Sequence, residues 1–278
     1  MTGTSRRKTL AGAVFAAAAV VLLGPFTVTT VLADTPQAAA PAQSAAAPVP
    51  VLKPQVLQEI PHDRTAFTQG FEIEDGKLYE GTGLAGRSQL RELDPDTGAV
   101  LRSVPLPGRL FGEGITVVGD RIWQLTYQDG VVLEWNRDTL TLNRRLPLQG
   151  EGWGLCYDGS RLVRSDGTDQ LSFYDPDTFA PEGTVKVTRD GAPVTQLNEL
   201  ECVDGQVYAN VWQTDEIHRI DPATGAVTAV IDASGLLDSP PPDSNDVLNG
   251  IAALCNGEFL ITGKRWPTTF RVRFTPAG

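Results

Sequence analysis

From residue 55 onward, apolar and polar residues alternate along short segments that are joined in pairs by tight turns. One such pair spans residues 111–127, with the sequence FGEGITVVGDRIWQLTY. Ile115 to Val118 is rich in β-branched residues, Gly119-Asp120 supplies a turn, and Arg121 to Tyr127 alternates and carries aromatics. The pattern predicts two antiparallel strands, and it returns four more times along the chain.

The five predicted hairpins recur at a regular spacing. Their turns start at residues 75, 119, 158, 204 and 256, so one unit spans about 45 residues. After each of the first four hairpins a third alternating segment ends in turn residues, as in the Asp-Pro-x-Thr-Gly sequences at 94–98 and 221–225. A fourth apolar segment follows. Each unit is therefore expected to be a four-stranded antiparallel sheet.

Four-stranded units at this period, with no helical segment between them, predict an all-β five-bladed β-propeller. The last unit ends with its third strand, Thr269 to Phe274, whereas Pro54 to Ile60 is a strand without a unit of its own. We expect this N-terminal strand to complete the last blade and close the ring without a free edge. A β-sandwich with irregular repeats is the alternative. Residues 239–246, SPPPDSND, are expected to form a surface loop.

The N-terminal residues differ in composition from the repeats. Basic residues 6–8 precede an apolar run, and residues 31–33 resemble a cleavage site, so residues 1–33 are expected to be a secretory signal of loosely twin-arginine type. An uncleaved membrane anchor is the alternative, although the apolar run is short for a full span. Residues 34–53 are expected to be an Ala/Pro-rich linker, and residues 54–278 the propeller domain.

The charge of the chain limits its partners. The formal net charge is −11, and loss of the three basic residues with the signal would lower it to −14. A chain this acidic is a poor candidate for binding nucleic acid or an anionic membrane, but it would attract peptides with a free α-amine. We expect an exported, extracellular monomer with no stable membrane insertion after signal cleavage.

The three cysteines are expected to be buried free thiols. Cys156 and Cys202 both lie two residues before an Asp-Gly turn, and Cys255 is the third. The first two would occupy equivalent places in neighbouring units, which we expect to be too far apart for a disulfide. Neither C-x-x-C nor H-E-x-x-H spacing is present in the sequence, so no metal site and no cofactor is expected.

The repeat also predicts which residues meet. The starts of the first strands and the ends of the second strands should collect on one face of a central channel. Glu113 stands out there, because it is a carboxylate between two glycines, which would let another molecule approach the backbone. The expected set has the makeup of a small polar pocket with aromatic walls. Its members are Phe67, Gln69, Phe111, Glu113, Tyr127, Trp153, Asp166, Asn198, Trp212, Asn249 and Lys264.

Each of these residues also has a purely structural interpretation. The aromatic residues would pack between blades, the asparagines would cap turns, and Lys264 would pair with Glu113 or Glu199. The sequence does not support the catalytic motifs of serine hydrolases. It contains no G-x-S-x-G motif, and its two histidines, His62 and His218, do not fit a Ser-His-Asp triad.

Several motifs resemble those of the plant-type glutaminyl-peptide cyclotransferases, which include the papaya-latex enzyme and bacterial relatives. The similar segments run in order through nearly all of residues 55–274. They include FTQG at 67–70, FGEGIT at 111–116, GWGL at 152–155, LNELE at 197–201, DVLNGIA at 246–252 and TGKRWP at 262–267.

The resemblance implies a five-bladed propeller that converts the N-terminal glutamine of peptides into pyroglutamate and releases ammonia, without a metal. By position, Glu113 matches the acid/base glutamate of the family. Tyr127 departs from the pattern, since the family usually has tryptophan there. The polar pocket positions fall on Gln69, Asn198 and Lys264, and the aromatic wall on Phe67, Phe111, Trp153 and Trp212.

The implied chemistry suits these residue types. One carboxylate can take a proton from the substrate α-amine and return one to the leaving ammonia. Lys264 and Asn198 would then stabilise the developing oxyanion. One alternative is a non-catalytic exported propeller that binds peptides or proteins. Another is a metal-dependent, lactonase-like propeller, which would need several carboxylates around the axis, whereas the sequence offers Glu113, Asp166 and Glu199.

Overall fold

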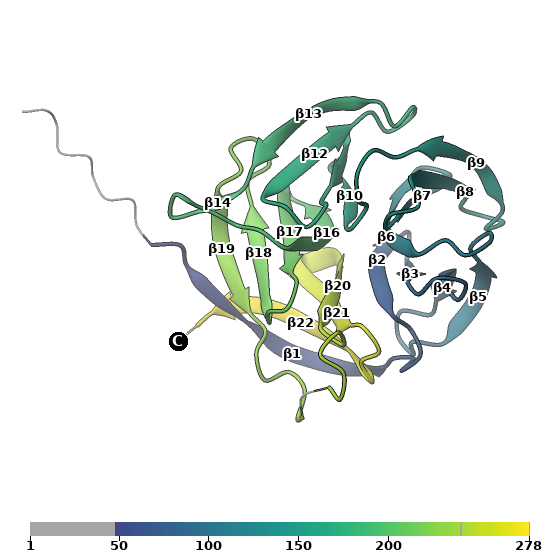
Figure 1. Ribbon diagram of the computed structural model, residues 1–278. Helices are drawn as coiled ribbons and strands as arrows, with labels where there is room; N and C mark the ends of the chain where they lie inside the picture. The colour runs from purple at the N-terminus through teal and green to yellow at the C-terminus, as the bar shows by residue number, and fades with distance from the viewer. Residues whose placement is uncertain (1–47, 240, 278) are drawn as a thin grey trace, which may run out of the picture. The chain divides into compact units, whose positions relative to one another are not determined.

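The computed structural model describes residues 48–239 and 241–277 (Figure 1). The expected signal segment and most of the expected linker, residues 1–47, lie outside this part. The described residues form an all-β structure, in which the 3-10 turn η1 (Cys255–Gly257) is the one helical element. No helix within this described part is long and apolar enough to cross a membrane.

The first three repeat units are separate four-stranded antiparallel sheets, each with its strands in chain order. The first is β2 (Thr68–Glu74), β3 (Lys77–Thr82), β4 (Gln89–Leu93) and β5 (Val100–Pro105). The second is β6 (Gly112–Val118), β7 (Arg121–Thr126), β8 (Val131–Asn136) and β9 (Leu142–Pro147). The third is β10 (Leu155–Tyr157), β11 (Leu162–Arg164), β12 (Gln170–Tyr174) and β13 (Pro181–Lys186).

The last two units belong to one eight-stranded sheet, in the order β16-β17-β18-β19-β1-β22-β21-β20. The fourth unit is β16 (Leu197–Val203), β17 (Gln206–Val211), β18 (Glu216–Ile220) and β19 (Val227–Asp232). The fifth unit is β20 (Leu248–Ala253), β21 (Glu258–Gly263) and β22 (Thr268–Pro276). A short hairpin that was not predicted, β14 (Thr188–Arg189) with β15 (Ala192–Pro193), lies between the third and fourth units.

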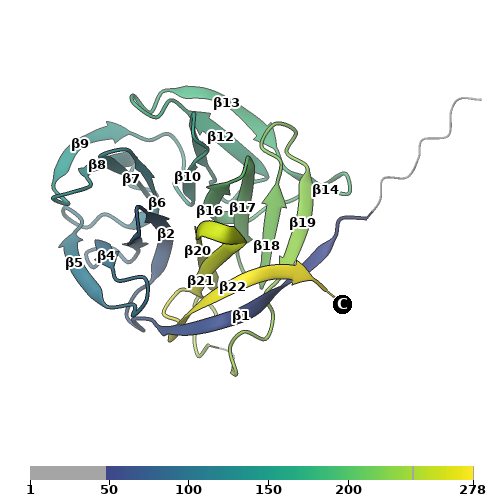
Figure 2. The same ribbon diagram turned by 180° about the vertical axis from the view of Figure 1, so that it is seen from behind.

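The N-terminal strand β1 (Val51–Pro61) links these two units. It pairs antiparallel with β22 from Leu52 opposite Pro276 to Pro61 opposite Thr268, and its first residues pair in parallel with β19. Figure 2 shows β1 and β22 side by side along this length. β1 thus lies between the last strand of the fourth unit and the last strand of the fifth unit, and it begins at Val51 rather than at Pro54.

The first strands of the five units lie next to one another in a closed series: β2 contacts β6, β6 contacts β10, β10 contacts β16, β16 contacts β20, and β20 contacts β2. Their approach is close. A Cβ atom added to Gly112 would lie 2.8 Å from the Thr82 oxygen, and one added to Gly114 would lie 2.6 Å from the Leu155 nitrogen. The two glycines beside Glu113 therefore admit neighbouring strands, and not another molecule as the sequence suggested.

The hydrophobic core lies between neighbouring sheets. Buried apolar side chains form five clusters, and each cluster joins residues of two adjacent units. Tyr79 of the first unit packs with Ile122 of the second, for example, and Trp123 of the second packs with Leu155 of the third. Each fully buried large side chain contributes about 1.5–3 kcal/mol relative to exposure. This packing holds the first strands around their common axis.

Cys156 and Cys202 form a disulfide, so the prediction of free thiols was wrong for these two residues. They lie on the neighbouring first strands β10 and β16, with their Cα atoms 5.4 Å apart. Equivalent positions in neighbouring units are far apart on the outer strands, but they meet where the first strands converge. The expectation for Cys255 concerns a side chain outside the described part.

Candidate active site

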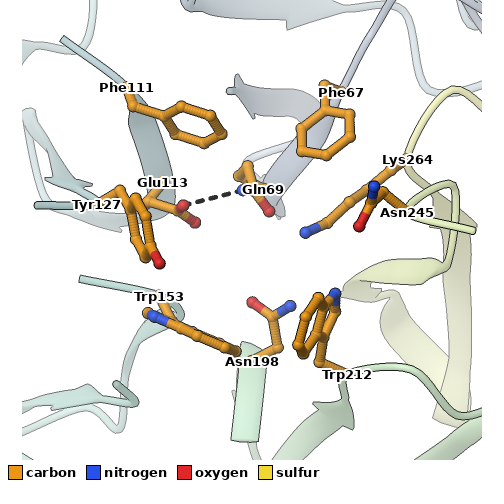
Figure 3. A pocket seen from close by; sticks show the side chains of 10 residues that line it. All are labelled: Phe67, Gln69, Phe111, Glu113, Tyr127, Trp153, Asn198, Trp212, Asn245 and Lys264. Atoms are coloured by element: carbon orange, nitrogen blue, oxygen red, sulfur yellow. Dashed lines mark hydrogen bonds between the residues drawn. The ribbon is translucent and has the colours of Figure 1, made fainter. Parts of the chain in front are cut away.

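A cavity of about 300 Å³ opens where the first strands begin (Figure 3). Nine of the eleven residues predicted for this site line it, and Asn245 is a tenth member that was not predicted. The nine are Phe67, Gln69, Phe111, Glu113, Tyr127, Trp153, Asn198, Trp212 and Lys264.

A β-bulge at the start of the first strand aims the polar side chains. In four of the five units the pairing of the first strand with the second shifts register there, at Thr68/Gly70, Gly112/Ile115, Leu197/Leu200 and Leu248/Ile251. A bulge sets two residues against one, bends the strand and redirects a side chain. The residues within these four shifts include Gln69, Glu113, Asn198 and Asn249.

Glu113 is buried, with 4% of its surface exposed. Its carboxyl group accepts a hydrogen bond from Gln69 Nε2 at 2.9 Å, the one such contact drawn among the residues that line the cavity (Figure 3). Burial raises the pKa of this carboxyl well above its ordinary value, the Lys264 ammonium opposes that rise, and the nearby Glu151 adds to it. Glu113 therefore holds its proton near neutral pH more readily than an ordinary carboxyl group.

Lys264 faces Glu113 across the cavity (Figure 3). Its burial lowers its pKa to about 8, although the carboxylate of Glu113 acts in the opposite direction. The ammonium lies 4.9 Å from the centre of the Phe67 ring, which stabilises the charge by a cation–π contact. The pKa values of the acid and the amine are thus shifted toward each other, as is typical of groups that exchange protons near neutral pH.

The aromatic residues form two walls. Phe111 lies between Phe67 and Tyr127, with ring centres 6.3 Å and 5.8 Å away. On the other side Trp153 and Trp212 meet edge to face at 5.8 Å. These walls enclose the space into which Glu113, Gln69, Asn198 and Lys264 project (Figure 3).

Two predicted site residues do not line the cavity. The Asp166 carboxylate lies 3.5 Å from Arg164 and accepts hydrogen bonds from Thr168, so it stabilises its own loop. Asn249 is fully buried, and its Nδ2 donates to the Thr68 carbonyl at 2.9 Å and to Gln69 Oε1 at 3.1 Å. Asn249 therefore orients Gln69, which in turn donates to Glu113.

Glu151 is a further residue near the cavity that was not predicted. Its carboxylate accepts hydrogen bonds from the Trp153 indole at 3.0 Å and from Gln128 Nε2 at 2.6 Å. It fixes one aromatic wall and adds negative charge near Glu113. Glu151 and Asn245 lie in loops, outside the repeated strand pattern, and only that pattern marked the other site residues.

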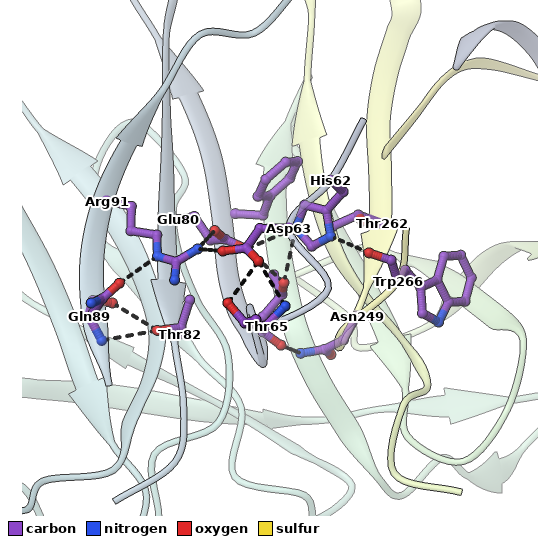
Figure 4. Close-up of polar contacts among 12 residues, drawn as sticks. His62, Asp63, Thr65, Glu80, Thr82, Gln89, Arg91, Asn249, Thr262 and Trp266 are labelled. Carbon is purple, nitrogen blue, oxygen red and sulfur yellow. Dashed lines mark hydrogen bonds and ion pairs between the residues drawn. The ribbon is translucent and has the colours of Figure 1, made fainter. Parts of the chain in front are cut away.

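A second buried polar cluster lies behind β2 (Figure 4). His62 Nδ1 donates to the Trp266 carbonyl at 2.8 Å, and His62 Nε2 lies 3.0 Å from Glu80 Oε1. The Thr68 hydroxyl donates to the same Glu80 oxygen at 2.7 Å. Because Trp266 follows Lys264 by two residues, this cluster ties the loop that carries Lys264 to the first sheet.

In this second cluster His62 and Glu80 each stabilise the charged form of the other. Burial alone would raise the pKa of Glu80, but the hydrogen bond and charge of His62, together with Arg91, lower it below its ordinary value. Burial alone would lower the pKa of His62, but Glu80 raises it. Arg91 lies 3.5 Å from Glu80 and 2.8 Å from Asp63. The sequence had indicated only that His62 belongs to no catalytic triad.

Glu199, an alternative carboxylate for the site, has a structural role. Its two oxygens accept the backbone N–H groups of Phe71 at 3.2 Å and Ile251 at 2.9 Å, which links β16 to β2 and β20. Across residues 48–239 and 241–277, no three His, Cys, Asp or Glu side chains are grouped so that they could hold a metal ion. The cavity is thus lined by one carboxyl group, one amine, three amides and the aromatic walls.

Comparisons with known proteins agree with this geometry. The sequence model of the glutamine cyclotransferase family matches residues 27–274. A glutaminyl-peptide cyclotransferase of Arabidopsis thaliana is 38% identical over 232 residues, which cover 80% of this chain and 72% of the plant protein. The crystal structure of glutaminyl cyclase from Myxococcus xanthus superposes with a TM-score of 0.78 at 39% identity, over 84% of this chain and 100% of the bacterial one. This chain belongs to the glutamine cyclotransferase family.

Proposed function

We propose that this protein is an enzyme that cyclises the N-terminal glutamine of peptides and proteins to pyroglutamate, with release of ammonia. The observation that carries the proposal is the Glu113 carboxyl with its raised pKa, which faces the Lys264 amine inside an aromatic cavity. The family of the chain supports the same reaction. Glu113, Lys264 and Asn198 are the proposed catalytic residues.

Glu113 serves as both base and acid in the proposed mechanism. The substrate α-amine attacks the carbon of its own γ-carboxamide, so a nitrogen–carbon bond forms and the bond to the amide nitrogen breaks. The proton that the amine loses passes to Glu113, and a proton from Glu113 passes to the leaving group, which departs as ammonia. A carboxyl group with an ordinary pKa would be a weaker base for the first transfer, so the burial of Glu113 favours catalysis.

The other residues of the cavity hold the substrate and its developing charge. The Lys264 ammonium and the Asn198 amide donate to the carbonyl oxygen as it becomes an oxyanion. The aromatic walls, with Phe67, Phe111 and Tyr127 on one side and Trp153 and Trp212 on the other, keep the glutamine side chain folded back on its own amine. The α-amine is then held close to the carboxamide carbon, which lowers the entropic part of the activation barrier.

We also infer that the five sheets are the blades of a β-propeller and that β1 closes the ring. The closed series of contacts among the first strands and the pairing of β1 with β22 support this interpretation. Export of the protein through segment 1–33, its action as a monomer and a reaction that needs no metal are further proposals, which rest on the sequence composition and on the chemistry of the cavity.

Mass spectrometry of peptides incubated with the purified protein tests the proposed activity. A Gln-initiated peptide should lose ammonia, while the same peptide initiated with asparagine should stay unchanged at matched enzyme concentration. Binding of the Gln-peptide without loss of ammonia would instead favour the non-catalytic alternative. Prolonged dialysis against a strong chelator should leave turnover intact, and a loss that zinc restores would contradict the metal-free mechanism.

A further inference from the structure

Asn245 is the one solvent-exposed residue among the ten that line the cavity. The other nine are buried or half-buried, so Asn245 marks the mouth of the cavity. It belongs to the loop between β19 and β20, which the sequence had suggested to be a plain surface loop.

The loop is braced from the side of Lys264. Asp243 Oδ1 accepts the backbone N–H of Asn245 at 2.9 Å. Arg265, which follows Lys264 in the chain, donates to Asp243 Oδ2 at 3.0 Å and to Asp246 Oδ1 at 2.7 Å. The guanidinium also lies 5.2 Å from the centre of the Phe67 ring. A pocket wall and the mouth loop are therefore held by one arginine.

A second brace comes from the side of Trp212. Gln213, the next residue in the chain, donates from Nε2 to the Ser244 carbonyl at 3.2 Å. Ser244 immediately precedes Asn245. Two side chains that follow pocket residues, Arg265 and Gln213, thus position the mouth loop.

These contacts also determine which way the Asn245 amide faces. Its Nδ2 donates to Asp243 Oδ1 at 3.2 Å. A carboxylate accepts hydrogen bonds and donates none, so the amide nitrogen must face Asp243 and the amide oxygen must face away from it. Figure 3 shows this oxygen on the cavity side, beside Lys264. Among the described residues, none donates a hydrogen bond to Asn245 Oδ1, which leaves an acceptor free at the mouth.

We propose that Asn245 Oδ1 accepts the N–H of the peptide bond that follows the N-terminal glutamine, and that it thereby selects peptides whose second residue carries this N–H. The inference rests on the proposed function. The glutamine side chain and the α-amine occupy the closed part of the cavity next to Glu113, so the chain beyond the α-carbon must pass the mouth. The first donor that it presents there is the N–H of the second residue. Proline at that position and ester-linked analogues lack this donor.

The test compares two substrates that differ in this N–H. One is a peptide that begins Gln-Ala, and the other is its ester analogue, in which lactic acid replaces alanine. A neutral hydrogen bond contributes about 0.5–1.5 kcal/mol, so the wild-type protein should prefer the peptide by roughly 3- to 10-fold in kcat/KM. Asn245→Ala should lose this preference, so the ratio of kcat/KM for the peptide to kcat/KM for the ester should fall by the same roughly 3- to 10-fold, with the change in KM rather than kcat.

Asn143→Ala is the matched control, because Asn143 is exposed on the outer strand β9 and far from the cavity mouth in the fold. This variant should keep the wild-type ratio. An Asn245→Ala protein that loses both substrates equally would show that Asn245 only braces the loop, and an unchanged ratio would also overturn the proposal. A wild-type protein that turns over neither substrate would refute the proposed function itself, which is a different result.

Discussion

Two consecutive residues of β2, Thr68 and Gln69, each donate a hydrogen bond to a buried carboxyl group. The pKa values of these two carboxyl groups are shifted in opposite directions. The Thr68 hydroxyl donates to Glu80, whose pKa is lowered, and the Gln69 amide donates to Glu113, whose pKa is raised. The two residues stand at the bulge of β2, which redirects a side chain, so adjacent positions of one strand serve two different sites.

The partners of the two carboxyl groups explain the difference, since burial raises the pKa of both. Glu80 receives the His62 ring nitrogen and the Thr68 hydroxyl on one oxygen and has Arg91 3.5 Å from the other. Glu113 has one neutral donor, and Lys264 acts on it only through its charge. Two hydrogen-bond donors and a nearby guanidinium stabilise the ionised form of Glu80, which gives this carboxylate a structural role. Glu113 has fewer such partners, so its carboxyl group can gain and lose a proton.

The largest expected effect is the loss of turnover in Glu113→Gln. The substitution keeps the shape of the side chain but removes the group that moves both protons in the proposed mechanism, so kcat should fall by about 10²- to 10⁴-fold while KM changes little. Steady-state kinetics on a Gln-initiated peptide measures it, and Asp120→Asn in the exposed β6–β7 turn is the control. A variant that keeps more than about a tenth of the wild-type kcat would contradict the assignment of Glu113 as the acid and base.

Replacing each of the two carboxyl groups by an amide should change the free energy of unfolding differently. Glu80→Gln leaves His62 and Arg91 without their buried counter-charge, and breaking a buried pair in this way costs about 3–5 kcal/mol of unfolding free energy. Glu113→Gln removes a poorly paired buried carboxyl and should be neutral or stabilising at neutral pH. Urea unfolding of both variants beside the wild type tests this, and equal losses in both would contradict the comparison.

The pH dependence of stability sharpens the same contrast. The folded-state pKa of His62 lies above 6.5, so its contribution is complete below that pH and is lost as the pH rises through the raised pKa. The stability difference between wild type and His62→Gln should therefore shrink at alkaline pH. Glu113 has a folded-state pKa above 4.5, so the wild type loses stability as the pH rises and Glu113→Gln gains relative to it. Unfolding midpoints of the wild type and of both variants, measured between about pH 5 and 9, test both expectations.

The smallest expected effect concerns Tyr127, which stands beside Phe111 in the aromatic wall. In the proposed mechanism, Tyr127→Trp enlarges a surface that contacts the substrate without touching the reacting atoms, so KM should change more than kcat, by less than about tenfold. Kinetics on several Gln-peptides would show it. A KM that stays the same for all of them would place Tyr127 outside the substrate contacts, and a large loss of kcat would give it a role that the geometry does not suggest.

The sequence by itself determined the repeat and most of the residues that line the cavity. Alternation and turn residues act locally, as at Asp94, whose Oδ1 accepts the backbone N–H groups of Asp96 at 3.0 Å and Thr97 at 2.9 Å. Because the units repeat in register, the sequence alone assigns residues at equivalent places, such as Gln69, Glu113 and Asn198, to one face.

Only the tertiary structure decided what depends on contacts between units. It brought Cys156 and Cys202 together where the first strands converge, placed Asn249 behind Gln69 and kept Asp166 in its own loop. The bulges that aim the polar side chains depend on pairing between strands, and no local pattern marks them. Asn245 reaches the cavity from a loop with no repeat equivalent. Above all, Glu80 and Glu113 are both buried, and their opposite pKa shifts arise from partners that only the folded chain assembles.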